Sequence, residues 1–205
     1  MPSGRAWRIK RKVIRNYNRL APIYNMLYAH EQNRKIKRVL DALNFRPLEA
    51  ILDVGCGTGL LFKHIANLTG LLIGIDIARE PLKIAKELIK NSESDEIFLV
   101  LADADFLPFR SNIFDKIFAI TLLQNMPDPT LTLNEIIRVA KENATIIVTG
   151  LKKAFSREFF SELLRKSDLR FTLLDDEEDI KCHIAICCKG DLAKNINKRE
   201  VKIIV

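Results

Sequence analysis

From residue 50 onward, short apolar runs alternate with segments that repeat apolar residues at helical spacing. The apolar runs, each with the length of a buried strand, are 50–55, 71–77, 97–101, 114–122 and 144–149. The segments with helical spacing are 60–68, 80–90, 132–141 and 156–166. Strands that alternate with helices imply right-handed crossovers and a mostly parallel sheet that is covered on both faces. The sequence therefore predicts an α/β fold with three layers.

The pattern changes near the C-terminal end. The runs 171–174 and 180–188 predict two strands joined by an acidic loop, a hairpin that would add one antiparallel strand to the sheet. Residues 191–205 are polar and then apolar, and we expect them to form a tail or one more edge strand. We expect a basic helical arm or lid over residues 1–45 and one ligand-binding domain over residues 46–190.

Basic residues are concentrated near the start of the chain. Of 205 residues, 33 are Lys or Arg and 26 are Asp or Glu, which gives a net charge of +7. Residues 1–40 hold eleven of the bases and one acid, so this segment carries +10 and the remaining 165 residues carry −3. Such a segment attracts anions, whether nucleic acid, a phosphorylated small molecule or an anionic membrane surface. The alternative is a solvated helix that only aids solubility.

Composition also bears on location and metal binding. Hydrophobic residues make up 48% of the chain, but no apolar run approaches the roughly 20 residues that cross a bilayer. The basic N-terminal segment lacks the apolar stretch of a secretory signal. Four cysteines, with Cys187 and Cys188 adjacent, make a poor disulfide framework, and no cysteine or histidine pair has metal-site spacing. We therefore expect a cytoplasmic protein without a metal site.

Three of the eight glycines fall within Asp53–Gly59, between the first expected strand and the first expected helix. Glycines at this place let the backbone turn tightly and approach a ligand, toward which the following helix points its N–H groups. A dinucleotide-binding loop has its third glycine three residues after the second, whereas Gly59 follows Gly57 by two. Asp53 is also poorly placed beside a diphosphate. The loop therefore favours a ligand that carries positive charge, and a tight turn without a ligand is the alternative.

Two further acids end neighbouring strands. Asp76 is placed to accept hydrogen bonds from both hydroxyls of a ribose, and Asp103 to accept one from the exocyclic amine of adenine. Each alone is consistent with a solvated strand end. Because the carboxyl ends of adjacent parallel strands meet at the crevice where open α/β sheets bind ligands, the two together indicate a nucleoside site.

Four segments in this order resemble the motifs of Rossmann-like (class I) S-adenosylmethionine-dependent methyltransferases: Asp53–Gly59 (DVGCGTG), Gly74–Ile77 (GIDI), Ala102–Phe109 (ADADFLPF) and Phe114–Pro129. Within that family the chain is most similar to the broad branch that includes the ubiquinone and menaquinone C-methyltransferases. The resemblance implies S-adenosylmethionine as the cofactor. It also implies a seven-stranded sheet of order 3-2-1-4-5-7-6 with strand 7 antiparallel.

The resemblance implies a set of cofactor-binding residues. The glycine loop would pass the methionine part of the cofactor, and Asp53 would face its amino group. Asp76 would hold the ribose, while Asp103 and the backbone of Ala104 would hold the adenine. The full set is Asp53, Gly55, Cys56, Gly57, Gly59, Asp76, Ile77, Asp103, Ala104, Thr121, Leu122, Tyr17 and Tyr24.

The remaining members of this set would form the floor and the lid of the site. Thr121 and Leu122 would line the floor beside the methyl group. Tyr17 and Tyr24 belong to the segment Asn16–Asn25, which resembles the N-terminal lid of the family, and would close over the cofactor carboxylate. The alternative for the two tyrosines is an ordinary place on the core side of an amphipathic helix.

Catalytic residues are less evident. A sulfonium methyl group is already a strong electrophile, so a base is needed only if the acceptor must lose a proton. Asn125, Asp128 and Tyr24 are the candidate catalytic residues. Relatives often carry paired histidines where this chain has Gln124-Asn125, so the acid–base role of those histidines does not carry over.

Three functions fit these features. The first is methylation of RNA or of a translation-associated protein, with residues 1–40 contacting phosphates. The second is methylation of a small molecule such as a quinone precursor, and the third is a non-catalytic cofactor-binding subunit.

One partner is implied by the resemblance. In the implied order Ile97–Leu101 is an edge strand of five apolar residues, and exposed apolar edges invite pairing with another chain. Enzymes of the resembling superfamily pair this edge with a small zinc-binding activator subunit. The alternative is that flanking helices cover the strand as ordinary core.

Overall fold

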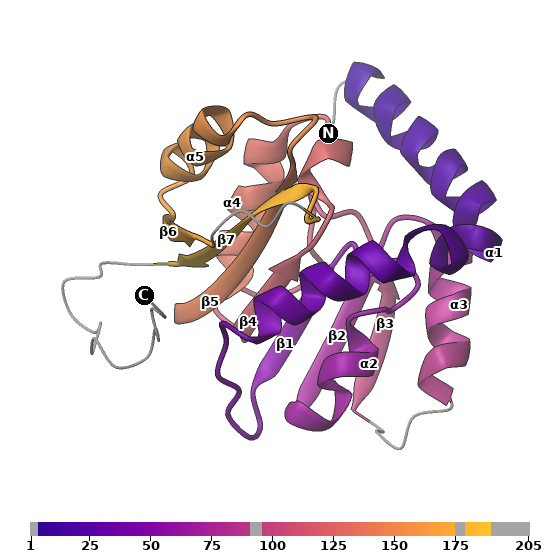
Figure 1. Ribbon diagram of the computed structural model, residues 1–205, viewed down its shortest axis with the longest axis horizontal. Coiled ribbons are helices and arrows are strands. Elements are labelled where there is room, and N and C mark those ends of the chain that lie inside the picture. Colours follow the sequence, from indigo (N-terminus) through magenta and orange to yellow (C-terminus); the bar gives the residue numbers. More distant parts are fainter. Residues whose placement is uncertain (1–3, 91–95, 175–178, 190–205) are drawn as a thin grey trace.

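One seven-stranded sheet forms the centre of the molecule (Figure 1). The computed structural model describes residues 4–90, 96–174 and 179–189. The strands are β1 (Ala50–Val54), β2 (Leu71–Asp76), β3 (Ile97–Leu101), β4 (Phe114–Ala119), β5 (Ala140–Leu151), β6 (Arg170–Leu173) and β7 (Cys182–Cys188). Their order is β3-β2-β1-β4-β5-β7-β6, and β7 is antiparallel to both of its neighbours. The α/β fold, the strand order and the antiparallel strand are thus as predicted.

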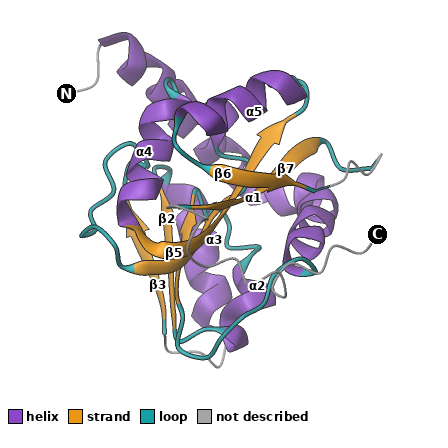
Figure 2. Cartoon of the chain, turned by 90° about the vertical axis from the view of Figure 1, so that its left-hand side faces the viewer, coloured by secondary structure: helices purple, strands orange, loops and turns teal. Residues whose placement is uncertain are grey.

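Helices cover both faces of the sheet (Figure 2). They are α1 (Gly4–Leu40), α2 (Phe62–Ile65), α3 (Arg79–Lys90), α4 (Pro129–Val139) and α5 (Arg157–Lys166), with short 3-10 helices η1 (Ala66–Leu68) and η2 (Leu123–Asn125). Ile36 of α1 and Phe62 of α2 are buried in one apolar cluster, together with residues of α3. Ile136 of α4 and Phe160 of α5 are buried in the cluster on the opposite face. The result is the predicted three-layer arrangement.

Helix α1 bends sharply near its middle (Figure 1), where Pro22 lies inside the helix. Proline lacks the N–H that would bond to the carbonyl of Asn18, and its ring crowds that carbonyl. The bend divides α1 into an N-terminal half, residues 4–21, and a C-terminal half. From here on, the word arm refers to residues 4–21 alone. The C-terminal half buries Ile36 and Val39 in the core, so α1 is anchored to the sheet at that end.

The first expected helix is much shorter than the prediction of 60–68. Leu60 and Leu61 lie in a turn, α2 spans four residues, and η1 completes the segment. Gly59 has a φ of 77°, which directs the chain out of helical geometry just before this point. Leu60 and Leu61 are buried, so their apolar spacing reflects core packing of a turn rather than a longer helix.

The middle strands also differ from the predicted ranges. The run 114–122 ends as a strand at Ala119, because Thr121 adopts a left-handed φ of 61°. The expected helix 132–141 ends at Val139, and β5 starts at once because Ala140 pairs with Phe114. Pairing with a neighbouring strand therefore overrides the helical pattern at that junction.

The C-terminal hairpin is present as β6 and β7, which pair antiparallel from Arg170 opposite Cys188 to Leu173 opposite Ala185. Residues 191–205, expected as a tail or an edge strand, lie outside the described residues.

Candidate functional site

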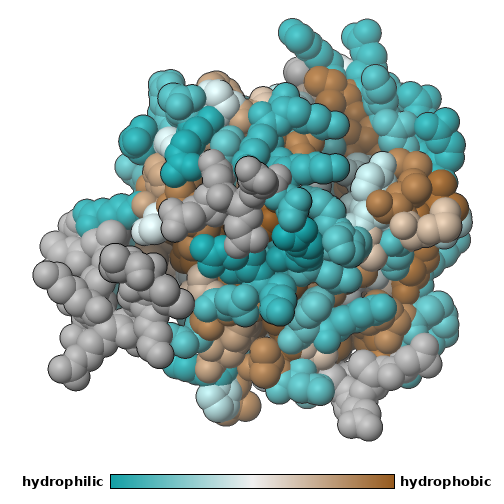
Figure 3. All heavy atoms as spheres, viewed as in Figure 1, coloured by the Kyte–Doolittle hydropathy of each residue, from teal (hydrophilic) through white to brown (hydrophobic). Residues whose placement is uncertain are grey.

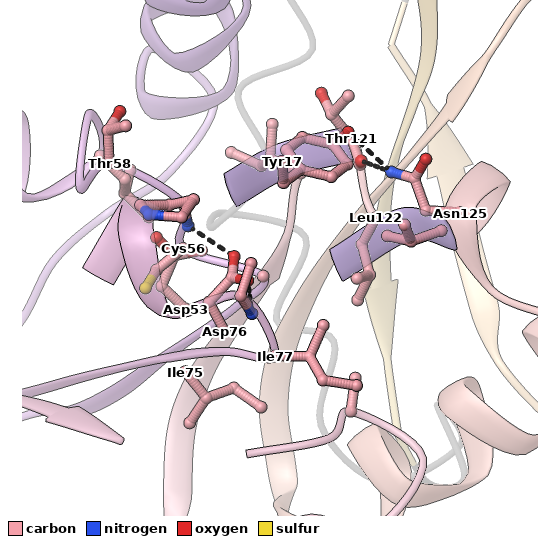
Figure 4. A pocket seen from close by; sticks show the side chains of 18 of the residues that line it. Tyr17, Asp53, Cys56, Thr58, Ile75, Asp76, Ile77, Thr121, Leu122 and Asn125 are labelled. Atoms are coloured by element: carbon pink, nitrogen blue, oxygen red, sulfur yellow. Dashed lines mark hydrogen bonds between the residues drawn. The ribbon is translucent and has the colours of Figure 1, made fainter. Parts of the chain in front are cut away.

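A pocket lies at the carboxyl ends of β1, β2, β3 and β4 and is partly enclosed by α1 (Figure 4). Three kinds of residue line it: the glycine loop after β1, the strand-end acids, and inward-facing residues of α1. Parallel strands all present this edge of a sheet to ligands, so the topology itself brings these distant segments together.

The glycine loop follows β1 and turns by way of three left-handed glycines. Gly55, Gly57 and Gly59 have φ values of 77°, 55° and 77°, a region that side chains other than glycine rarely adopt. The backbone N–H groups of Gly55 and Cys56 donate to the carbonyl of Ile75 at 2.8 and 2.9 Å, which ties the loop to β2. A Cβ built on Gly57 would meet no atom within 4 Å, so the loop leaves space beside its backbone.

Asp76 is held in place by the loop that it faces. Its Oδ2 accepts from the N–H of Gly57 at 3.0 Å, and its Oδ1 accepts from the N–H of Ala78 at 2.8 Å. Burial raises the pKa of Asp76, while these backbone donors lower it. The backbone N–H of Ile77 also donates to this carboxylate, which still has acceptor capacity for a ligand hydroxyl.

Asp53 lines the pocket with a buried carboxyl group that has no hydrogen-bond partner within the described residues. Burial, and after it the charge of Asp76, raise the pKa of Asp53 to about 8. A buried carboxylate without a partner is costly, and a cationic ligand group would remove that cost. Asp53 thus has the environment expected of a residue that binds an ammonium group.

Asp103 already has a cationic partner from α1. Nζ of Lys10 lies 2.7 and 2.6 Å from the two carboxylate oxygens of Asp103, and it also contacts Asp105. Lys10 and Asp105 are each 3% exposed, so this is a buried cluster rather than a surface ion pair. Lys10 lines the pocket, a place that its position in a basic helix does not predict.

Helix α1 is fastened over the pocket by side-chain amides. Oδ1 of Asn25 accepts from the Thr58 hydroxyl at 2.6 Å, and Oδ1 of Asn18 accepts from the N–H of Glu80 at 2.9 Å. Nδ2 of Asn125 donates to the Tyr17 hydroxyl at 3.0 Å (Figure 4). These bonds link α1 to the glycine loop, to α3 and to η2, on three sides of the pocket.

The end of the pocket beyond β4 is built around Thr121. This β-branched residue has a φ of 61°, which is a strained conformation that persists only where neighbours enforce it. Its N–H donates to the Thr149 hydroxyl at 2.7 Å, and its own hydroxyl accepts from Nζ of Lys35 at 2.8 Å. Lys35 is 1% exposed and also donates to Oε1 of Gln32 at 3.2 Å. Lys35 and Gln32 could not be recognised from the sequence, because the partner that brings both to the pocket, Thr121, lies more than eighty residues away.

Most of the residues predicted from the sequence meet in this pocket. Those that line it are Asp53, Gly55, Cys56, Gly57, Asp76, Ile77, Asp103, Ala104, Thr121, Leu122, Tyr17, Tyr24 and Asn125. Gly59 does not line it, because a Cβ there would face Phe62 and Ala85 instead, so its place is in the packing of the loop on α3. Asp128 does not line it either: its Oδ1 accepts from the N–H of Thr130 at 3.0 Å and caps α4.

The titratable groups at the Thr121 end are poor bases. Burial raises the pKa of Tyr17 and of Tyr24, so both are neutral phenols near pH 7. Within the described residues, the carboxylates that line the pocket are Asp53, Asp76 and Asp103, all on the glycine-loop side. Among the described residues that line this end of the pocket, no side chain has the character of a general base near pH 7.

The residues present fit S-adenosylmethionine. The unpartnered Asp53 carboxyl suits an ammonium group, and the open space beside Gly57 suits a chain lying along the loop. Asp76 faces the pocket with acceptor capacity left for a ribose hydroxyl. Asp103 has the acceptor atoms for an adenine amine, although Lys10 contacts both of them.

The chain matches a family model described as a methyltransferase domain over residues 46–200. It is 32% identical over 144 residues to a demethylmenaquinone methyltransferase of Staphylococcus aureus, covering 68% of this chain and 57% of that protein. The chain spans about half the length of the curated relatives it matches.

Solved structures share the fold. One is described as an S-adenosylmethionine-dependent methyltransferase of Methanococcus maripaludis, with a TM-score of 0.73, 16% identity, and coverage of 88% of this chain and 95% of that one. Another is the methyltransferase in a complex with the Trm112 activator of Haloferax volcanii, with a TM-score of 0.68, 15% identity, and coverage of 85% and 98%.

Across the described ranges, no helix is both long and apolar enough to cross a membrane. The order of the strands, the glycine loop with its two downstream acids and the family match agree with one another. The chain therefore belongs to the family of Rossmann-like methyltransferase domains that use S-adenosylmethionine.

Proposed function

We propose that this protein binds S-adenosylmethionine in the pocket and transfers its methyl group to RNA. The observation that carries the choice of acceptor is the outer face of the arm. Six basic side chains are exposed there, on the helix whose inner face lines the pocket: Arg5, Arg8, Arg11, Lys12, Arg15 and Arg19. Phosphates bound along this face would lie beside the pocket and not on a remote surface.

The cofactor supplies an electrophilic methyl group on a sulfonium sulfur, and the chain's own residues bind and orient it. In this proposal Asp53 pairs with the amino group of the cofactor and Asp76 accepts from the ribose hydroxyls. Thr121 and Leu122 form the floor at the methyl end. The tyrosines of α1 exclude water above it, since both are more than half buried and lie against Asn125 and Gln32.

The acceptor end favours a nucleophile with a free lone pair. Tyr24, Gln32, Thr121, Asn125 and Met126 line this end, and they offer hydrogen bonds but no base. A ring nitrogen of a nucleobase meets that requirement, because it attacks through a lone pair that is available at neutral pH. Such an acceptor needs only to be held in line with the methyl group.

A small-molecule acceptor is the second candidate. It is favoured by the similarity to the demethylmenaquinone methyltransferase of S. aureus. In that case the arm would serve as a lid or would contact an anionic membrane surface.

One labelling experiment separates the two candidates. The purified protein is incubated with S-adenosylmethionine labelled on the methyl group and with either total RNA or a lipid-soluble extract, and Asp76→Ala is run alongside. Label in RNA that ribonuclease releases supports the first proposal, and label in the extract supports the second. Calorimetry of the cofactor with both proteins comes first: micromolar binding that Asp76→Ala abolishes is the expected result. Binding without transfer to either fraction contradicts both acceptor proposals.

We also propose that a small activator subunit, of the zinc-binding kind, pairs with β3. This strand is an edge of the sheet, and Phe98 and Leu101 are 48% and 52% exposed. The H. volcanii neighbour is a methyltransferase in complex with an activator, which supports such a partner here.

The test is co-purification with tagged protein. Phe98→Glu should release a bound small subunit, while Phe159→Glu, at an equally exposed phenylalanine on α5, should retain it. A wild-type protein that is monodisperse and active alone contradicts the need for a partner.

A further inference from the structure

The side chain of Lys10 forms an ion pair with Asp103, the residue that we propose as the contact for the adenine amine. Its Nζ contacts both oxygens of Asp103, at 2.7 and 2.6 Å, from a residue 93 positions earlier in the sequence. Oδ1 of Asp103 also accepts the N–H of Asp105 at 3.1 Å. Both Lys10 and Asp103 line the pocket, so the ammonium group stands where an adenine amine would have to approach.

We propose that Lys10 is a built-in competitor of the cofactor's adenine, so that docking of the arm and binding of the base exclude each other at Asp103. This inference rests on the proposed function, because it takes Asp103 as the adenine contact. It adds a closed state in which the chain's own side chain fills one subsite of the cofactor pocket.

The competition follows from the strength of the two contacts. An ammonium group makes charge-assisted hydrogen bonds to a carboxylate, which are about twice as strong as those of a neutral donor. The adenine amine is neutral and must replace that contact. The affinity observed for the cofactor is therefore the intrinsic affinity reduced by the fraction of molecules in which Asp103 is free.

The buried environment makes the closed state specific. Asp105 is 3% exposed and also contacts Lys10, and its only other side-chain partner among the described residues is the Thr132 hydroxyl. Two acids thus share one ammonium group. Because the arm that carries Lys10 also carries the exposed basic face, release of Asp103 is linked to the surface that we propose for the anionic acceptor.

The test compares two ligands of equal charge. S-adenosylhomocysteine has an amine at position 6 of the base, and S-inosylhomocysteine has a carbonyl there, which cannot donate to Asp103. Both are titrated into wild type, Lys10→Met and Lys12→Met. Lys12 is exposed on the same helix, so the control removes the same charge two residues away. We expect Lys10→Met to bind S-adenosylhomocysteine about tenfold more tightly, a change of about 1.4 kcal/mol. S-inosylhomocysteine should gain much less from Lys10→Met, because its carbonyl cannot replace the ammonium group at Asp103, and Lys12→Met should leave the affinity for both ligands unchanged.

An Asp103→Asn background completes the cycle, since Lys10→Met should have no effect on affinity there. Thermal melting checks that each variant is folded, and emission from Trp7, the single tryptophan, reports whether the arm is docked. Lys10→Gln, which removes the charge and shortens the side chain by one atom but keeps a polar end, is the second variant should Lys10→Met melt early.

Three results overturn the proposal. Unchanged or weaker binding of S-adenosylhomocysteine by Lys10→Met shows that Lys10 does not compete. An equal gain for both ligands shows a general opening of the pocket and not competition at Asp103. Failure of the wild type and of both variants to bind either ligand or S-adenosylmethionine overturns the cofactor site itself, and the inference with it.

Discussion

At the scale of single residues, the pocket contains a buried acid, Asp53, whose ionisation destabilises the folded protein. Asp53 is 4% exposed, and its pKa is raised to about 8 by burial and by the charge of Asp76. The folded chain therefore keeps a proton on Asp53 at pH values where the unfolded chain has lost it. Folding takes up that proton, so stability falls as the pH rises from the unfolded pKa, about 3.9, toward 8.

Asp53→Asn removes this cost and should stabilise the protein without its cofactor. The difference in the free energy of unfolding between the variant and wild type should widen from pH 5 to pH 8, by at most about 1.4 kcal/mol per pH unit. Urea unfolding at both pH values measures it. The variant should lose binding of S-adenosylmethionine, whereas wild type should bind more tightly as the pH rises toward 8, because the cationic ligand favours the ionised carboxyl. A constant difference in stability across this range would mean that Asp53 is ionised in the folded protein.

Two glycines of the loop allow a matched comparison. Gly57 and Gly59 both have left-handed φ values, so alanine at either should cost about 1 kcal/mol of backbone strain. A Cβ at Gly59 would also lie 2.9 Å from Phe62 and 3.2 Å from Ala85, whereas one at Gly57 meets no protein atom within 4 Å. Gly59→Ala should therefore lower the melting temperature more, and Gly57→Ala should weaken cofactor binding more. Equal effects of both variants on binding would contradict the assignment of Gly57 to the ligand and Gly59 to packing.

Residues that belong to local motifs could be predicted from the sequence, and residues that act through distant partners could not. Asp76 and the loop glycines could be predicted, because the end of a strand and a tight turn are local features of the sequence. Lys10 and Lys35 were missed, because a lysine in a basic helix looks like any solvated charge until its partner 93 or 86 residues later is known. The left-handed conformation of Thr121 could not be predicted either, since β-branched residues normally avoid it.

At the scale of elements, a substitution of Asp128 tests whether this residue acts in catalysis or only caps helix α4. Its side chain accepts from the N–H groups of Thr130 and Leu131 at 3.0 and 3.4 Å and so caps α4. Asp128→Ala should cost about 1 kcal/mol of stability. Cofactor affinity and methyl transfer should stay at the wild-type level, as in Ser156→Ala, which removes the cap of α5. A selective loss of transfer in Asp128→Ala would restore a role for Asp128 in catalysis.

The elements themselves were predictable to the extent that burial dictates composition. Strands β1 and β2 are mostly apolar because they lie inside the sheet and are covered on both faces, and β3 is apolar although it is a partly exposed edge. The positions of all three match the predicted runs closely. The start of β5 was not predictable, since Lys141, Glu142 and Asn143 are exposed polar residues that extend the strand only because its neighbour begins there. The short length of α2 could not be predicted either, because Leu60 and Leu61 fit a helical pattern although they are buried in a turn.

At the scale of the whole molecule, α1 joins two surfaces that the rest of the fold keeps apart. Its inner face places Lys10, Tyr17 and Tyr24 in the pocket, and the outer face of its arm is basic. The bend at Pro22 lets one helix do both, since the C-terminal half is fixed in the core while the arm follows the pocket. Figure 3 shows mostly hydrophilic surface along the arm, interrupted by brown patches. Ile9 on the arm is 40% exposed.

This arrangement predicts how RNA binding should depend on salt. Each phosphate neutralised on a single strand contributes about −0.7 to the slope of log K against log salt concentration. Arg8, Arg11 and Arg15 line one shallow hollow on the arm, so replacing all three by glutamine should flatten the slope by about 2 and weaken binding at low salt. The matched control replaces Lys83, Lys86 and Lys90, three exposed lysines of α3, by glutamine, and should leave the slope nearly unchanged. Fluorescence anisotropy with a labelled single-stranded RNA over a range of salt concentrations measures both. Because the two variants lose the same charge, equal flattening would place the effect in the net charge of the molecule, whereas a change confined to the arm variant would assign the phosphate contacts to the helix that also encloses the pocket.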